Sequence, residues 1–264
     1  MYSSVIRDDE YKSHLTDFIM RKYGISVTSI TAAKRGFYGE TWKVSDENAH
    51  YFLKLVYATE HKPIYERSFP IIQHLCEHGI DFISRIVKTK QAKLSTRFDD
   101  AVVGLFEWIE GENTESHETK KHEYQMLAKV YAVPASNLDI LQEDFSNKDM
   151  LEFIRLRSTI NNTQIHLLLE SRRNKLEHLA KRLDMFSKLC QKDKSGFVIT
   201  HCDAGGNFIV SDSKNFIVDW DGVTLAPPER DAWVMCCHDW ARKAFQDALK
   251  ENGIAYELCH KRLA

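Results

Sequence analysis

Polar and potentially reactive side chains are concentrated between residues 198 and 231. This segment contains three short strings, VITHCDAGGN (198–207), NFIVDWDG (215–222) and LAPPERD (225–231). The first two strings begin with strand-like apolar runs, so Asp203, Asn207 and Asp219 are expected to project from strand ends or tight loops onto one surface. Carboxylates held this close repel one another unless a cation lies between them. Mg²⁺ takes one or two such carboxylates and completes its shell with water and phosphate oxygens. The segment therefore predicts a magnesium site used for phosphate chemistry.

The first half of the chain supplies the groups expected to bind the phosphates. No GxxxxGK[ST] string is present, but a glycine turn (Gly36 to Gly39) precedes Lys54, which lies inside the apolar run YFLKLV (51–56). A lysine among apolar neighbours needs a partner, because an unpaired buried charge is costly. Glu66, on the helix predicted next, is the expected partner. A glycine turn, a strand lysine, a helix glutamate and then the aspartate-rich strings follow the order of parts in protein-kinase-like phosphotransferases.

Hydrophobic periodicity predicts an α+β chain of two lobes. A helix ending at Gly24 precedes strands over 27–33, 40–44 and 51–56. A helix over 63–78 follows, in which Pro70 implies either a kink or a start later than Pro63. Strands over 85–89 and 101–108 come next. Beyond Gly111 the pattern is mostly helical, over 117–131, around 176–190 and over 232–258, with short strand-like runs at 197–200 and 215–220. The apolar stripe of 176–190 predicts core packing. We expect an antiparallel-sheet lobe over 1–108 that binds nucleotide and a mostly helical lobe over 109–264 that carries catalysis and substrate binding.

Composition and charge argue against several classes of protein function. The 264 residues carry a net charge of −2, which argues against a protein that coats nucleic acid. No apolar run approaches the roughly 18 residues of a membrane span, and the charged N-terminus does not resemble a signal peptide. The six cysteines are scattered without a CxxC pair, as in a reducing compartment. We expect a cytoplasmic protein without nucleic-acid or membrane partners; the sequence leaves the oligomeric state open.

At this point the chain resembles the aminoglycoside phosphotransferase family, whose relatives include choline kinases and methylthioribose kinases. The similarity is closest in VITHCD (198–203) and IVDWD (217–221), and LAPPERD (225–231) is most similar to the spectinomycin-kinase branch. The order of the weaker features from Gly24 to Asp231 also fits, so the resemblance covers most of the chain.

The resemblance implies an ATP- and Mg²⁺-dependent kinase with a protein-kinase-like fold. Asp203 falls on the catalytic residue that accepts or orients the substrate hydroxyl, and Asn207 and Asp219 fall on the metal ligands. The resemblance also assigns the remaining roles: Lys54 contacts phosphate, Glu66 forms its salt bridge, Gly36 and Gly39 form the glycine turn, Phe106 and Trp108 stand at the interlobe hinge beside adenine, and Asp231 braces the catalytic loop.

Three features depart from the family pattern. Three residues instead of four separate Asp203 from Asn207, the glycine turn carries Phe37 and Tyr38, and the sequence ends one or two helices earlier. The two glycines at 205 and 206 make the shorter loop sterically possible.

Two alternatives therefore stay open. One is a catalytically impaired nucleotide-binding regulator. The other is a metal-dependent hydrolase that uses His201, Asp203, Asp219 and Asp221 as ligands. For His201 itself, hydrogen bonds that hold the loop are the expected role.

The phosphate acceptor is expected to be a small hydroxyl-bearing molecule. Acidic side chains downstream of the metal site, at Asp221, Glu229 and Asp239, favour a cationic acceptor such as an aminoglycoside or aminocyclitol antibiotic, or a related metabolite. Antibiotic resistance is the biological role that this acceptor would imply.

Overall fold

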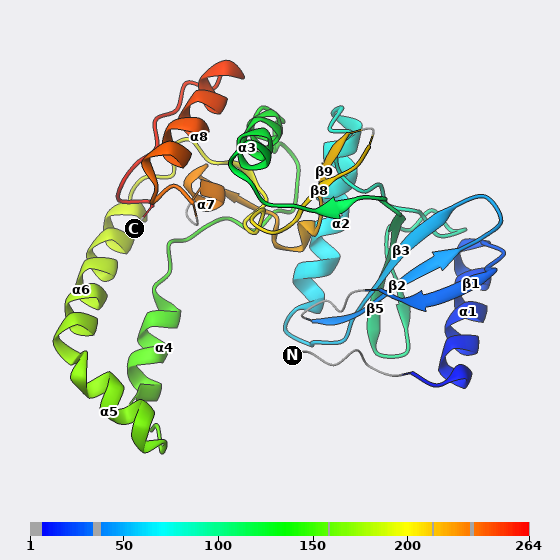
Figure 1. Ribbon diagram of the computed structural model, residues 1–264, viewed down its shortest axis with the longest axis horizontal. Helices are drawn as coiled ribbons and strands as arrows, with labels where there is room; N and C mark the ends of the chain where they lie inside the picture. The colour runs from blue at the N-terminus through cyan, green and yellow to red at the C-terminus, as the bar shows by residue number, and fades with distance from the viewer. Residues whose placement is uncertain (1–6, 34–37, 158, 213, 233–234, 264) are drawn as a thin grey trace.

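The computed structural model describes residues 7–33, 38–157, 159–212, 214–232 and 235–263. It has an N-terminal lobe built on an antiparallel sheet and a mostly helical C-terminal lobe (Figure 1). The boundary at residues 108 and 109 stays a prediction. None of the helices in the described ranges is both long enough and apolar enough to span a bilayer.

The N-terminal lobe is a five-stranded antiparallel sheet between two helices. The strands lie in the order β1-β2-β3-β5-β4, with bounds β1 Ser29–Ala32, β2 Gly39–Ser45, β3 His50–Val56, β4 Thr96–Phe98 and β5 Ala101–Glu107. Side chains alternate across β3, so Leu53 and Leu55 pack in one core cluster with helix α1 (Asp9–Tyr23), whereas Val56 packs in the other with helix α2 (Lys62–Glu77). Lys54 lies two residues before Val56, so its side chain points to the same, α2 side of the sheet.

Local signals account for the ends of both helices. Asp8 caps α1 by accepting a hydrogen bond from the Tyr11 amide at 2.8 Å, and Gly24 ends it with a φ of 77°. Pro63 stands in the first turn of α2, where no amide donor is needed. The later start that Pro70 suggested does not occur: α2 begins at Lys62 and continues through Pro70. Pro70 is exposed, so water can satisfy the carbonyl that its missing amide leaves unpaired.

The C-terminal lobe packs helices around two small sheets. Helix α3 (His117–Tyr131) lies against α8 (Asp239–Glu251), with the rings of Tyr124 and Phe245 edge to face at 4.9 Å. One sheet pairs β6 (Glu112–Asn113), β8 (Phe208–Val210) and β9 (Asn215–Ile217); the other pairs β7 (Val198–Thr200) with β10 (Thr224–Ala226). A short 3₁₀ helix, η1 (Trp220–Gly222), and α7 (Glu229–Ala232) complete the region.

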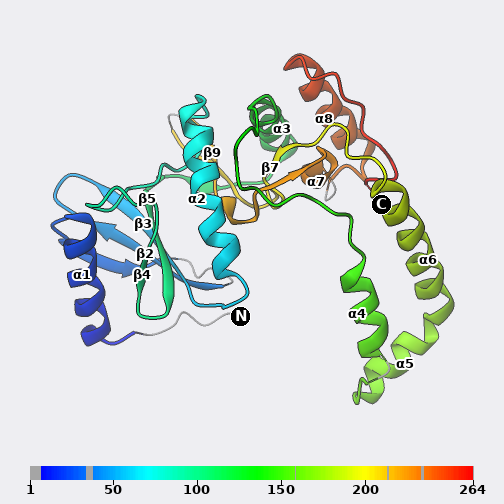
Figure 2. The ribbon, with the colours of Figure 1, turned by 180° about the vertical axis from the view of Figure 1, so that it is seen from behind.

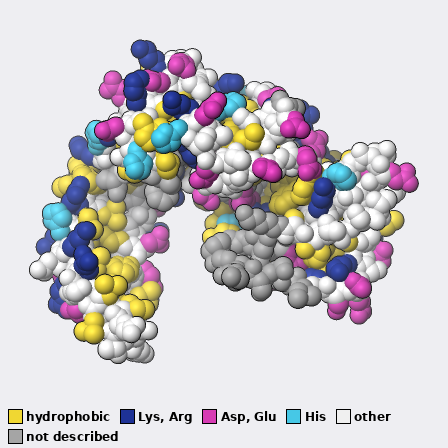
Figure 3. Space-filling model, in the orientation of Figure 1, with side chains coloured by type: hydrophobic (Ala, Val, Ile, Leu, Met, Phe, Trp, Pro, Cys, Tyr) yellow, Lys and Arg dark blue, Asp and Glu magenta, His cyan; other side chains and the backbone are white. Residues whose placement is uncertain are grey.

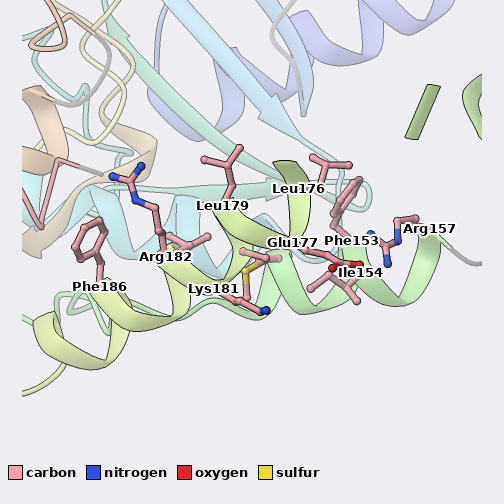
Figure 4. Close-up of a pocket in the computed structure, with 12 residues that line it drawn as sticks. Phe153, Ile154, Arg157, Leu176, Glu177, Leu179, Lys181, Arg182 and Phe186 are labelled. Atoms are coloured by element: carbon pink, nitrogen blue, oxygen red, sulfur yellow. The ribbon is translucent and has the colours of Figure 1, made fainter. Parts of the chain in front are cut away.

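Three helices project from this lobe as an arm, visible from both sides in Figures 1 and 2: α4 (Lys148–Arg157), α5 (Thr163–Ser171) and α6 (Arg173–Cys190). The core packing predicted for the stripe of α6 holds at its end, where Cys190 is buried, but is wrong along the arm, where Leu179 and Leu183 are 45% and 40% exposed. They line a groove of about 690 Å³ between α4 and α6 with Phe153 and Phe186 (Figure 4). Figure 3 shows the apolar side chains of the arm at the surface, interspersed with basic ones. Amphipathic periodicity identified the apolar side of the helix but not whether another element covers it.

Some predicted strands also differ from the structure. The strand predicted over 85–89 is an isolated bridge between Ile86 and Phe106. Strands β4, β6, β8 and β10 were not predicted; each has only two or three residues. The helix expected over 232–258 is represented by α8 within that range. These differences lie at short or edge segments, where pairing depends on neighbouring strands more than on local pattern.

Candidate active site

Lys54 lies in the middle of the sheet and faces α2. Its cross-strand partner on β5 is Gly104. A Cβ atom at Gly104 would lie 2.5 Å from the Tyr65 hydroxyl and from a ring carbon of Phe69, so glycine is needed there for α2 to approach the sheet. The Lys54 ammonium stands 5.4 Å from the centre of the Tyr65 ring. The sheet and α2 together fix the direction of this lysine.

Lys54 joins the two lobes. Its Nζ lies 2.6 Å from Asp219 Oδ1 and 2.5 Å from Asp221 Oδ2, and both carboxylates come from the segment around η1. Lys54 and the late segment of Asp219 and Asp221, which are more than 160 residues apart in the sequence, therefore meet at one place.

Burial and neighbouring charges shift the pKa values of Lys54 and Asp221 in opposite directions. Burial alone would lower the pKa of Lys54, but the negative charges of Asp221 and Asp219 outweigh it and raise that pKa. Burial would raise the pKa of Asp221, yet the His61 imidazole and the Lys54 ammonium together lower it. The lysine is therefore protonated and the carboxylate ionised at neutral pH. Asp219 is more open, with its side chain 47% exposed against 13% for Asp221.

The predicted ion pair between Lys54 and Glu66 is not formed. Glu66 instead accepts a hydrogen bond from Arg97 at 2.8 Å on the outer side of α2. Successive helix residues point about 100° apart, and Tyr65 already occupies the face of α2 that meets the sheet. Glu66 is consequently turned away, and Asp219 and Asp221 take its predicted place beside Lys54.

The predicted catalytic loop, from Asp203 to Asn207, closes in spite of its shorter spacing. The Asn207 amide bonds back to the Ala204 carbonyl at 3.0 Å, and Gly206 adopts a φ of +86°, which favours glycine. The Asn207 side-chain nitrogen donates to the Asp203 carbonyl at 2.6 Å. This bond uses the side-chain nitrogen, and the side-chain oxygen is the atom of Asn207 that can serve as a metal ligand.

His201 holds this loop by hydrogen bonds, which is the structural role expected for it. It is fully buried, and its Nε2 donates to the Val218 carbonyl at 2.8 Å while its Nδ1 accepts from the Asp203 amide at 3.2 Å. Both ring nitrogens are thus used within the protein. The imidazole links the Asp203 loop to the strand end that carries Asp219.

Asp231 braces the same loop from α7. Its carboxylate accepts hydrogen bonds from the amides of His201 at 3.1 Å and Cys202 at 2.6 Å, and from the Tyr131 hydroxyl at 2.9 Å. Cys202 has a φ of +72°, which is unusual for a residue with a side chain. The hydrogen bonds from Asp231 stabilise this conformation immediately before Asp203.

The Asp203 carboxylate is exposed, as a group that meets a substrate must be. Its partial burial raises its pKa, and the nearby negative charge of Asp219 raises it further, although His201 and Arg230 act in the opposite direction. A carboxylate with a raised pKa is a stronger proton acceptor once it is ionised.

The donor set beside Asp203 suits Mg²⁺. The Val218 amide bonds to the Asn207 carbonyl at 2.9 Å, which places Asn207 next to Asp219. Asp219 has a φ of +64°, in the left-handed region that aspartate tolerates better than most residues with a side chain. One amide oxygen and one exposed carboxylate are the hard ligands that Mg²⁺ uses with phosphate and water. The residues present therefore fit a magnesium–nucleotide complex.

The remaining predicted nucleotide-binding residues are placed as follows. Gly36 lies outside the described residues. Gly39 opens β2, where a Cβ atom would lie 1.7 Å from the Leu55 carbonyl oxygen, so its identity follows from close strand packing. Phe106 is 8% exposed and stacks on Phe69 at 5.7 Å. Trp108 is partly exposed beside Lys43, whose ammonium is 4.4 Å from the ring centre.

Other contacts revise two sequence interpretations. A hydrolase would need His201 and Asp221 as metal ligands, but the first is committed to backbone hydrogen bonds and the second to Lys54. Of the acids proposed to attract a cationic acceptor, Glu229 is 1% exposed and bonded to Tyr256, and Asp239 pairs with Arg242. Roles for His61 and Gly104 were not predicted, because they depend on tertiary contacts: His61 lies beside Asp221, and Gly104 lies against α2.

Comparisons with known proteins agree with this geometry. The sequence profile of the phosphotransferase enzyme family matches residues 29–264. The crystal structure of spectinomycin phosphotransferase in complex with ADP and spectinomycin superposes with a TM-score of 0.77 at 20% identity, covering 95% of this chain and 82% of that one. An aminoglycoside phosphotransferase from Alicyclobacillus acidocaldarius gives 0.64 at 16% identity, with 96% and 78% covered. A macrolide 2'-phosphotransferase from Brachybacterium faecium gives 0.65 at 12% identity, with 94% and 86% covered.

These likenesses confirm the predicted α+β, protein-kinase-like fold, and the profile match confirms the predicted family. No curated protein matches the chain at the level of sequence. Because the profile covers most of the chain, the prediction of an enzyme that transfers phosphoryl groups is also confirmed. The chain belongs to the phosphotransferase enzyme family.

Proposed function

We propose that this protein is an ATP-dependent kinase that transfers the γ-phosphate to a hydroxyl of a small molecule. The contact between Lys54 and Asp219 carries the proposal, because it brings the predicted phosphate-binding lysine of one lobe onto the predicted metal ligand of the other. Structural neighbours solved with ADP or AMP support a nucleotide as the donor.

Each residue at the site has a defined task in this proposal. Lys54 binds the nucleotide phosphates, and Asn207 and Asp219 hold Mg²⁺, which neutralises phosphate charge when bound. Asp203 orients the acceptor hydroxyl and accepts its proton. Because the transition state of phosphoryl transfer is loose, positioning and charge neutralisation supply most of the catalysis. Gly36, Gly39, Phe106 and Trp108 are proposed to surround the nucleotide.

The hinge offers a place for adenine. The amides of Glu107 and Trp108 donate to the carbonyls of Arg85 and His50 at 2.9 and 3.1 Å, so these two groups serve the fold. Within the described chain, the Ile109 amide makes no such bond, and we propose that it faces the adenine ring. The roles of Phe106 and Trp108 would then be those of apolar walls.

For the acceptor, we propose a hydroxyl-bearing cation of the aminoglycoside or aminocyclitol class or a related metabolite. The exposed carboxylate of Asp203 favours a cation, and similar structures include spectinomycin phosphotransferase and an aminopropanol kinase. Resistance to an antibiotic, in the cytoplasm, is the corresponding biological role. Glu66 is no longer part of the proposed site.

The test combines an acceptor screen with two variants. ATP consumption is measured with aminoglycosides, spectinomycin, aminopropanol, choline and methylthioribose. Asp203→Asn should leave nucleotide binding nearly unchanged and lower turnover by about 10²–10⁴-fold, whereas Asp219→Asn should also weaken Mg·ATP binding. Nucleotide binding without turnover on any acceptor would favour the impaired regulator, and failure to bind nucleotide would refute the proposal.

A further inference from the structure

A histidine outside the predicted site borders the Lys54 cluster. His61 stands immediately before α2, with its side chain 13% exposed and its Nε2 3.6 Å from Asp221 Oδ2. That distance is longer than a hydrogen bond, and within the described chain this buried nitrogen has no hydrogen-bond partner. Leaving such a group unpaired is costly, so a state in which it is paired is expected.

The ring of His61 is held in place. Tyr38 stacks on it with ring centres 3.7 Å apart and planes inclined by 13°. On its other side the imidazole meets Asp221, whose Oδ2 is shared with Lys54. A small movement of Asp221 or His61 along this direction would shorten the contact to a hydrogen bond.

Asp221 needs a partner whether or not nucleotide is bound. It is buried beside Tyr65, and in this structure Lys54 supplies the charge that it requires. If Lys54 turns toward the nucleotide phosphates, as the proposed function requires, its bond to Asp221 weakens. A buried carboxylate left without a partner would oppose that movement.

We propose that His61 is a positioning residue that donates a hydrogen bond from Nε2 to Asp221 when nucleotide binds and thereby releases Lys54 toward the phosphates. This inference rests on the proposed function, because it requires that Lys54 binds phosphate.

The position of His61 predicts an effect that depends on phosphate. Loss of His61 should weaken the binding of a nucleoside triphosphate, which needs Lys54, and leave adenosine, which has no phosphate, bound as before. A merely structural role would weaken both ligands together. Gln at this position keeps an amide donor near Nε2, so it should restore part of the lost affinity.

The experiment is isothermal titration of the full chain with Mg·AMP-PNP and, separately, with adenosine. His61→Ala should raise the Kd for Mg·AMP-PNP by about 10- to 100-fold, the range for a hydrogen bond to a charged group, without changing that for adenosine. His61→Gln should recover at least part of this loss. His78→Ala is the matched control, because His78 is an exposed histidine at the end of the same helix and its ring contacts are local, to the carbonyl and the ring of His74.

The outcomes separate the inference from the function beneath it. If the wild-type chain binds neither ligand, the proposed function fails. If the wild type binds both and His61→Ala binds Mg·AMP-PNP equally well, or loses both ligands to the same extent, only the role of His61 is overturned. Thermal unfolding of each variant with and without ligand shows whether the folded state is retained; if His61→Ala does not fold, the comparison of His61→Gln with wild type decides by the same two criteria.

Discussion

The brace formed by Asp231 provides a quantitative test of how the catalytic loop is held. In the variant Asp231→Asn, one oxygen is replaced by an NH₂ group, which cannot accept from the amides of His201 or Cys202. At least one charge-assisted hydrogen bond is lost, and a backbone donor is left unpaired. A hydrogen bond to a charged group contributes about 1.5–3 kcal/mol. We therefore expect a loss of about 2–3 kcal/mol in the free energy of unfolding.

The measurement is denaturant unfolding together with the melting temperature. About 1 kcal/mol corresponds to roughly 2–4 °C in a chain of this size, so Tm should fall by roughly 5–10 °C. Turnover should fall as well, because Cys202, at a φ of +72°, immediately precedes Asp203. Asp239→Asn is the control: its side chain is 92% exposed and its ion pair with Arg242 is local, so stability should change by less than about 0.5 kcal/mol. Equal stability of Asp231→Asn and wild type would refute the brace.

Three further predictions concern a backbone conformation, a buried carboxyl group and an exposed side chain. Gly206→Ala should lower the free energy of unfolding by about 1–2 kcal/mol, measured with denaturant, and slow turnover, because Gly206 has a φ of +86°. Gly205→Ala is the control: nothing lies within 4 Å of its Cβ position, so neither stability nor turnover should change. Burial raises the pKa of Glu123 from 4.5 to about 7, so the folded state keeps a proton that the unfolded state releases between these values. Stability should therefore fall by roughly 1–3 kcal/mol as pH rises through that window, and a pH series of unfolding curves for Glu123→Gln should lack this fall. Leu183→Gln, on the open arm, should cost less than about 1 kcal/mol, against about 2–5 for Leu127→Ala in the core; equal costs in the same unfolding assay would contradict the exposure of α6.

Local sequence patterns predicted the elements whose ends have their own chemical signals. The helix predicted over 117–131 is observed with those bounds, and Ser116 caps its start through a reciprocal pair with Thr119. The αL glycine at 24 likewise marked the end of α1. The general position of Lys54 could also be predicted, because a lysine inside an apolar strand requires a charged partner.

The identity of that partner could not be predicted from the sequence. Whether Lys54 meets Glu66 or Asp221 depends on the rotation of α2 against the sheet, which Gly104 and Tyr65 determine through close packing. The exposure of the α6 stripe depends in the same way on whether another element covers the arm. Both errors concern tertiary neighbours, which periodicity does not specify.

The central claim is that the lysine of one lobe and the acidic loops of the other enclose a single triphosphate. A crystal structure of the full chain with AMP-PNP and Mg²⁺ tests it most directly. We predict Lys54 Nζ at about 3 Å from a nucleotide phosphate oxygen, with Asn207 and Asp219 on the same Mg²⁺ ion. Nucleotide bound elsewhere, with Lys54 still paired to Asp219 and Asp221, would contradict the account.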